Sequence, residues 1–206
     1  MRGHESIIQR YRDVGARVLV VENPYLPNAN EKMFAIALDG HNGTGRWPIG
    51  DRPRYDIPLE DWHSGGDHVL VLLQRGIGQI GVAMPLGWPK EIAGWLKRHT
   101  DRPIIVRRHP AGRPQPLEPH LKKCWAAITW GSGAACKAIA AGVPAFYALP
   151  RWIGRAAAIQ IDDMADIEQP YRGQRNDFVK AISWAQWTLA EVEDGKAFEA
   201  VLQCAA

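Results

Sequence analysis

The sequence predicts an α/β fold in three layers, with helices on both faces of a mostly parallel sheet. Two observations predict it. Short Val- and Ile-rich apolar runs alternate with helical patterns of about ten residues, and polar residues follow the apolar runs. The chain has 206 residues, of which 46% are hydrophobic and 23% charged, so it can bury a core of ordinary composition.

The first part of the chain combines a helix, two strands and a long loop. Residues 5–14 have a helical pattern, and the apolar runs 16–23 and 33–40 are typical of strands separated by a Pro- and Asn-rich loop. Residues 41–67 contain five glycines, three prolines and little periodicity. A loop of this length in a compact domain is usually functional, or else marks a boundary.

Beyond residue 67 the alternation of strands and helices is regular. The predicted strands are 68–76, 102–110, 125–130 and 143–150, and the predicted helices are 88–100, 116–124 and 133–142. The last third, residues 174–203, is predicted to be helical by its 3.6-residue spacing. This spacing puts Trp184 and Trp187 on one helix, where they either pack it on the sheet or form an interface stripe.

The change of pattern near residue 65 predicts two parts. Residues 1–65 would form a small N-terminal α/β part, and residues 66–206 a larger domain with C-terminal helices.

Composition excludes several classes of protein. The net charge of +3 and the pI near 8.8 fit an anionic ligand without indicating nucleic acid. The sequence contains no apolar run of about 18 residues, so we expect no membrane span, and we also expect no secretory signal. Cys124, Cys136 and Cys204 form no CxxC pair, so we expect no disulfide framework, no zinc site and a cytoplasmic location.

Polar, basic and small residues gather where the predicted strands end. In open parallel sheets, ligands bind outside the carboxyl ends of the strands, so these residues are the candidates for a site. They are Glu22 and Asn23, Asp39 to Gly43, Gln74 to Gly76, Arg107 to Pro110, and Gly131 to Gly133.

The sequence Gly131-Ser132-Gly133 opens a predicted helix. Either Ser132 is an ordinary N-cap, or the helix amides and the serine hydroxyl bind a phosphate that the flanking glycines allow to approach. No GxxxxGK[ST] pattern occurs, which argues against a P-loop nucleotidase.

The run from Arg107 to Pro110 is a positive cluster at a strand end. Arginine pairs with phosphate in a bidentate manner, and the extended backbone of His109 before proline lets that residue contact a base, ribose or phosphate. Strand alternation sends Arg107 and Arg108 to opposite faces, so at most one of them should share a site with a given neighbour. The alternative is a solvated strand end.

Two carboxylates, Glu22 and Asp39, follow adjacent predicted strands. One of them could act as general base toward a hydroxyl acceptor, or each could cap a turn. A metal site is not expected, because Asp162 and Asp163 lack a third ligand and are interpreted as a helix N-cap.

Three stretches resemble the capsule-polysaccharide-biosynthesis type of glycosyltransferase, a GT-B-like family. The stretch VENPYLPNANEKMFAIALDGHNG resembles its E-x-GYL-x-P…G-x-N pattern, with Pro24 in place of glycine. HVLVLLQRGIGQI resembles its vLvplQ…D strand, with Gln74 matching and the aspartate absent. The similarity covers about residues 16–150.

The third stretch combines IIVRRHP with AAITWGSGAACKAIAAGVPAFY, which resembles v-K-x-HP followed by NS-T/S…EAl-x-GkPv. The matching residues are His109, Pro110, Ser132, Gly142 and Pro144. Two residues depart from the pattern: Gly131 replaces the asparagine, and Lys137 replaces the glutamate that in the family could bind the donor ribose.

The resemblance implies a reduced, Rossmann-like GT-B fold and a metal-independent transfer of sugar from a nucleotide sugar to a hydroxyl. His109 and Pro110 would contact the nucleotide, Ser132 and its helix would hold the phosphate, and Glu22 or Asp39 would act as base. The other candidates for the donor side are Gln74, Arg75, Arg108, Gly131 and Gly133. No cofactor is implied.

The whole chain also resembles small tailed-phage proteins classed as glycosyltransferases, which makes a hydroxymethylated base of phage DNA a candidate acceptor. A full GT-B enzyme has two Rossmann-like domains. This shorter chain is therefore a reduced enzyme, or a second subunit or partner completes its cleft, or catalysis is lost. The alternatives to an enzyme are a nucleotide- or glycan-binding protein and a nucleic-acid module without chemistry.

Overall fold

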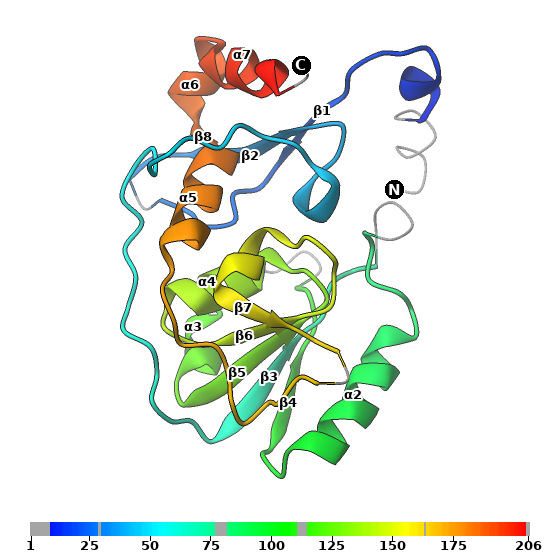
Figure 1. Cartoon of the computed structure of the whole chain (residues 1–206), viewed down its shortest axis with the longest axis vertical. Coiled ribbons are helices and arrows are strands. Elements are labelled where there is room, and N and C mark those ends of the chain that lie inside the picture. Colours follow the sequence, from blue (N-terminus) through cyan, green and yellow to red (C-terminus); the bar gives the residue numbers. More distant parts are fainter. Residues whose placement is uncertain (1–8, 29, 77–81, 111–114, 163, 205–206) are drawn as a thin grey trace.

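The computed structural model describes residues 9–28, 30–76, 82–110, 115–162 and 164–204. It contains a five-stranded sheet, in the lower part of Figure 1, and a three-stranded sheet, in the upper part. Candidate site residues lie between them, so the arrangement of the two sheets positions the site.

The large sheet confirms the predicted parallel α/β arrangement. Its strands, all parallel, lie in the order β4-β3-β5-β6-β7. They are β3 (His68–Leu72), β4 (Ile104–Arg107), β5 (Cys124–Thr129), β6 (Ala145–Tyr147) and β7 (Ala158–Gln160). The helices between them are α2 (Trp88–His99), α3 (Glu118–Leu121) and α4 (Gly133–Ala140).

Both faces of the large sheet are buried along its inner strands β3, β5 and β6, whereas Ile105 and Val106 of the edge strand β4 are exposed. Along β3, Val69 and Val71 pack on the side of α2, whereas Leu70 and Leu72 pack on the side of α4. Because successive side chains of a strand point to opposite faces, these alternating residues make one layer of helix on each side of the sheet. The three-layer prediction is therefore confirmed.

The small sheet is antiparallel, which the sequence did not indicate. It consists of β1 (Leu19–Glu22), β2 (Met33–Leu38) and β8 (Gln186–Thr188), in the order β1-β2-β8. Leu19 lies opposite Leu38, and Glu22 lies opposite Ala35. The carboxyl ends of β1 and β2 therefore lie at opposite edges of the small sheet.

The predicted helical character of residues 174–203 is confirmed except at a short strand in the middle of the range. The chain forms α5 (Asn176–Ala185), then β8, then α6 (Leu189–Glu193) and α7 (Lys196–Gln203). Thr188 caps α6 in a capping box with Glu191, which ends the strand and starts the next helix.

The two tryptophans of this tail do not share a helix. Trp184 lies on α5 and donates a hydrogen bond from Nε1 to the carbonyl of Arg52, at 2.8 Å. Trp187 lies on β8 and is buried against α7. Trp187 therefore lies in the core, whereas Trp184 is half-buried, and the two side chains form no common interface stripe.

The division at residue 65 does not follow the sheets, because β8 from the C-terminal part completes the N-terminal sheet. Residues 46–67, which we call the crossing segment, run from the small sheet to the large one along the outside of the molecule (Figure 1). The amide of His63 donates to the carbonyl of Gly142 at 2.7 Å. The guanidinium of Arg54 donates to the carbonyl of Gln186 at 2.8 Å and lies 3.7 Å from the ring of Trp187.

Three further predictions concern the first helix, the pair Asp162 and Asp163, and membrane spans. Residues 9–13 are helical, and residues 5–8 of the predicted first helix lie outside the described residues. Asp162 accepts the amide of Met164 in a turn rather than starting a helix, and Asp163 also lies outside them. Within the described part of the chain, no helix is long and apolar enough to cross a membrane.

Candidate functional site

A cleft of about 1220 Å³ lies between the two sheets, at the carboxyl edge of β3, β4 and β5. All the residues to which a catalytic or donor-binding role was assigned, except Asp39, line it. These residues are Glu22, Gln74, Arg75, Arg108, His109, Pro110, Gly131, Ser132 and Gly133. The parallel strands thus place their polar ends at one edge, as the topology requires.

The wall formed by the large sheet is basic. Arg75, Arg107, Arg108 and Lys137 all line the cleft, against one carboxylate on that side, Glu118. The expectation that only one of the two neighbouring arginines would share the site is wrong. Because β4 ends at Arg107, the alternation of a strand no longer applies to Arg108.

The start of α4 also faces the cleft. The amide of Ser132 donates to Oγ1 of Thr129 at 2.8 Å, and the hydroxyl oxygen of Ser132 accepts the amide of Ala134 at 3.2 Å. Ser132 is therefore the N-cap of α4. The Cβ that Gly133 lacks would lie 3.5 Å from Cδ1 of Tyr25, so the glycine leaves open the path to the first turn of the helix.

His109 is held by the neighbouring strand end. Nε of Arg75 donates a hydrogen bond to Nδ1 of His109 at 3.1 Å. Burial lowers the pKa of His109, and the charge of Arg75 lowers this pKa further. The ring is therefore neutral near pH 7 with Nδ1 as an acceptor, which leaves the proton on Nε2 as a hydrogen-bond donor.

Gln74 follows β3 on the same wall. Its Oε1 atom is buried and has no hydrogen-bond partner among the described residues. A buried polar atom without a partner costs free energy. Because Gln74 lines the cleft, a rotation of its side chain would bring Oε1 to a ligand there.

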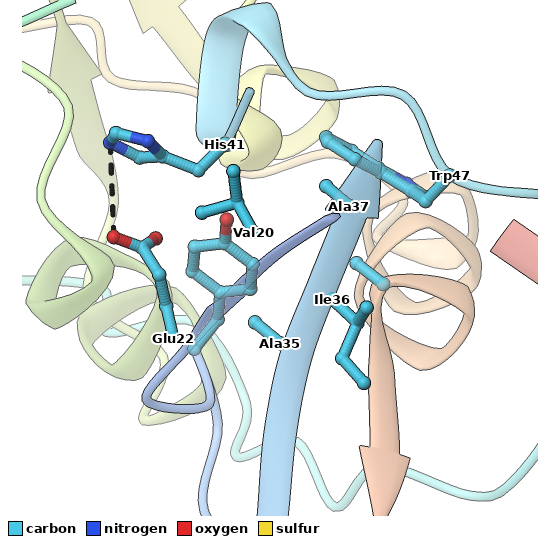
Figure 2. A pocket seen from close by; sticks show the side chains of 9 residues that line it. Val20, Glu22, Ala35, Ile36, Ala37, His41 and Trp47 are labelled. Carbon is cyan, nitrogen blue, oxygen red and sulfur yellow. Dashed lines mark ion pairs between the residues drawn. The ribbon is translucent and has the colours of Figure 1, made fainter. Parts of the chain in front are cut away.

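The opposite wall carries a carboxylate and an imidazole. Oε1 of Glu22 lies 3.9 Å from Nε2 of His41, and both side chains line the cleft. Figure 2 shows the two side chains next to one another beside Val20, Ala35 and Ala37 of the small sheet.

The phenol of Tyr25 lies under this wall and is buried. Burial raises the pKa of Tyr25, and the nearby charge of Glu22 raises it further. Tyr25 is therefore a neutral phenol, and the carboxylate of Glu22 carries the negative charge of this wall.

A short 3₁₀ turn, η1 (Asn42–Thr44), presents His41 and ties it to the start of α4. The buried Asn42 donates from Nδ2 to the carbonyl of Gly131 at 2.7 Å, and its Oδ1 accepts the amide of Ile153 at 3.1 Å. The sequence placed His41 and Asn42 among the candidate residues at strand ends but assigned neither of them a role in the site. The sequence feature that could have identified them as site residues is the G-x-N pattern formed by Gly40 to Asn42.

Asp39 does not belong to the cleft. It ends β2 at the edge opposite Glu22, so the expectation of two neighbouring carboxylates is wrong. Its carboxylate accepts the amide of Val18 at 3.1 Å and pairs with Arg17 and Arg46. Burial alone would raise the pKa of Asp39, but these partners outweigh burial and lower it.

In the described ranges, no group of three or more His, Cys, Asp or Glu side chains could hold a metal ion.

Comparison with known proteins gives a likeness in fold. No protein-family model and no curated protein matches the chain. Among solved structures, the chain is similar to KpsC of Thermosulfurimonas dismutans, a beta Kdo 2,7 transferase, with a TM-score of 0.52 and 11% sequence identity. The match covers 96% of this chain and 83% of that one. At this identity the likeness concerns the fold alone, and the chain thus has a Rossmann-like α/β fold that a transferase also uses.

Proposed function

We propose that this protein is a glycosyltransferase that moves a sugar from a nucleotide-activated donor to a hydroxyl acceptor. The observation that carries the proposal is the contrast between the two walls of the cleft. One wall offers basic side chains and a helix start, and the other offers a carboxylate beside an imidazole. The likeness in fold to a transferase supports it.

The donor side of this proposal is the wall formed by the large sheet. Arg75, Arg107 and Arg108 provide charge that attracts a phosphate, and the first turn of α4 adds its dipole. His109 and Gln74 offer a donor and an acceptor that could recognise the sugar, ribose or base. At about 1220 Å³ the cleft is large enough for a nucleotide sugar and an acceptor together.

The same charges provide a way to stabilise the leaving group. When the bond between sugar and phosphate breaks, negative charge develops on the phosphate oxygen. Arginine side chains and the positive end of the helix dipole that line the cleft would stabilise this charge and so lower the barrier. The proposed reaction therefore requires no metal ion and no cofactor.

The acceptor side of the proposal is the small-sheet wall, where Glu22 and His41 face the cleft. The proposed acceptor is a hydroxyl compound, which must give up its proton when it reacts, and a base on this wall would receive that proton. The resemblance to phage proteins suggests a hydroxymethylated DNA base as one acceptor, and this base should be among the acceptors that are tested.

The first experiment is a thermal-shift screen with UDP, GDP, CMP, dTDP and their sugars. Stabilisation by one of them, lost in His109→Ala and Arg108→Gln, would support the donor site. Arg98→Gln is the matched control, because Arg98 lies on α2 away from the cleft.

The binding result also separates the proposed enzyme from its alternatives. If no nucleotide or nucleotide sugar stabilises the wild-type protein, the donor site is wrong. If one binds but is never turned over with any acceptor or with water, the protein is a nucleotide-binding protein rather than an enzyme.

A further inference from the structure

We propose that His41, and not Glu22, receives the proton of the acceptor hydroxyl, and that Glu22 positions the imidazole and stabilises its protonated form. This inference rests on the proposed glycosyl transfer and assigns a residue to the step in which the acceptor reacts. It makes His41 the catalytic residue and Glu22 a positioning residue.

The geometry places both groups at one point of the cleft. The distance of 3.9 Å between Oε1 of Glu22 and Nε2 of His41 is that of an ion pair, and it is too long for a direct hydrogen bond. Catalytic hydrogen bonds are often long before the substrate binds and tighten in the complex. The side chain of His41 is 30% exposed and that of Glu22 40%, so an acceptor can reach either.

The chemistry favours the imidazole as the base. A ring nitrogen of histidine can accept a proton and pass it on, and histidine is the side chain that most often serves as general base. A general base works best when its proton affinity matches the working pH. A carboxylate beside the ring stabilises the imidazolium that forms, so the two groups have complementary roles.

The backbone around His41 keeps the ring in place. The carbonyl of His41 accepts a hydrogen bond from the amide of Thr44 and another from its hydroxyl, both at 3.1 Å. The next residue, Asn42, is fixed to the loop before α4 by its bond to Gly131. The backbone that carries the imidazole is thus held at a fixed position relative to the helix start that would bind the donor phosphate.

The proposed step is balanced within the cleft. The O–H bond of the acceptor breaks, and its proton passes to an imidazole nitrogen of His41. The electron pair of that bond forms the new bond from the acceptor oxygen to the sugar carbon. The bond that this carbon made to its leaving group breaks, and its electron pair departs with the leaving group.

The test uses the nucleotide sugar that stabilises the wild-type protein, with water as the acceptor and release of nucleotide as the readout. We expect His41→Ala to lower kcat by roughly 10²–10⁴-fold while the KM for the nucleotide sugar changes little. Added imidazole should restore part of the activity, because it can enter the space that the side chain leaves. His41→Asn is a second variant in case alanine disturbs the turn.

Two further variants complete the test. Glu22→Gln should lower kcat less than His41→Ala does, and imidazole should not restore it. His99→Ala is the matched control for removal of a histidine, because His99 lies at the end of α2 and does not line the cleft.

Each other result has a definite meaning. Full activity of His41→Ala, or its loss without any rescue by imidazole, would overturn the assignment of His41 and leave the proposed transfer intact. Loss of all turnover in Glu22→Gln, with His41→Ala active, would make Glu22 the base. Failure of every nucleotide sugar to bind the wild-type protein would instead overturn the proposed function itself.

Discussion

The side-chain amide of Asn42 donates a hydrogen bond to the carbonyl of Gly131 at 2.7 Å, although 89 residues separate them in the sequence. Asn42 adopts a positive φ of 49°, a conformation that asparagine tolerates better than most residues. This bond joins the turn that carries His41 to the loop that begins α4, so the two walls of the cleft are held together at this point.

Replacement of Asn42 by aspartate should test this link. The carboxylate cannot donate to the carbonyl of Gly131, so a buried acceptor would face another acceptor. We expect a loss of about 2–4 kcal/mol in the free energy of unfolding, measured by urea denaturation. Asn28→Asp is the control at an exposed loop and should change little. A stable Asn42→Asp variant would show that the bond matters little.

The role of Asp39 is predicted to be structural and dependent on pH. Because its pKa is lower in the folded than in the unfolded chain, its contribution to stability is present above its ordinary value of 3.8 and is lost as pH falls through the folded value. Asp39→Asn should cost about 1–3 kcal/mol at pH 7, and the difference from wild type should shrink in acid.

Nucleotide binding by Asp39→Asn should equal that of the wild-type protein, since Asp39 does not line the cleft. Denaturation at pH 7 and pH 3, together with the thermal-shift screen, measures both effects. A variant with normal stability and impaired turnover would restore Asp39 as a candidate base.

The hydrogen bond between Arg75 and His109 predicts a measurable titration. The pKa of His109 should lie below its ordinary value of 6.5, mainly because of burial, and Arg75→Gln should raise it by removing a nearby positive charge. Titration of the ring resonances by NMR measures both values. An unchanged pKa in Arg75→Gln would show that the two side chains do not interact in solution.

Two glycines provide a matched pair of substitutions. Gly142 and Gly195 have φ values of 73° and 85°, so alanine would strain the backbone at either position. Only at Gly142 would the new Cβ also meet another atom, the carbonyl oxygen of Asp61 in the crossing segment, at 2.0 Å.

Gly142→Ala should therefore cost more than Gly195→Ala, by about 1–3 kcal/mol, because the crossing segment must move away. Thermal or urea unfolding of both variants measures the difference. Equal losses would show that the crossing segment does not pack firmly at this point.

Most of the large sheet could be predicted from the sequence because β3 to β6 are built from local patterns. Each of these strands is an apolar run, and their parallel pairing follows from the helices between the runs. The strand β7 (Ala158–Gln160) was not among the predicted strands, because it has three residues and follows a 3₁₀ turn rather than a helix. The small sheet could not be predicted in this way, since β8 has three residues inside a tail of helical spacing. It becomes a strand only because β2 offers a partner. The one local signal was Thr188 followed by Glu191, which fits the start of a new helix.

Only part of the candidate site could be predicted from the sequence, as was the case for the two sheets. Arg75, Arg108, His109 and Ser132 follow parallel strands, so one rule about strand ends brings them together. That rule assigned Asp39 to the cleft as well, but it fails for an antiparallel pair. His41 lies close to Glu22 because a turn after β2 folds back over β1, and no local pattern gives the direction of that turn.

The pairing of Met33 with Thr188 has a consequence for biosynthesis. A chain emerging from the ribosome exposes β1 and β2 long before their third strand has been made. The large sheet can pair its neighbouring strands as they appear, whereas the small sheet must wait for the tail. The wall that carries Glu22 and His41 would then be the last part of the cleft to form, and newly made chains would acquire activity only after β8 has been synthesised.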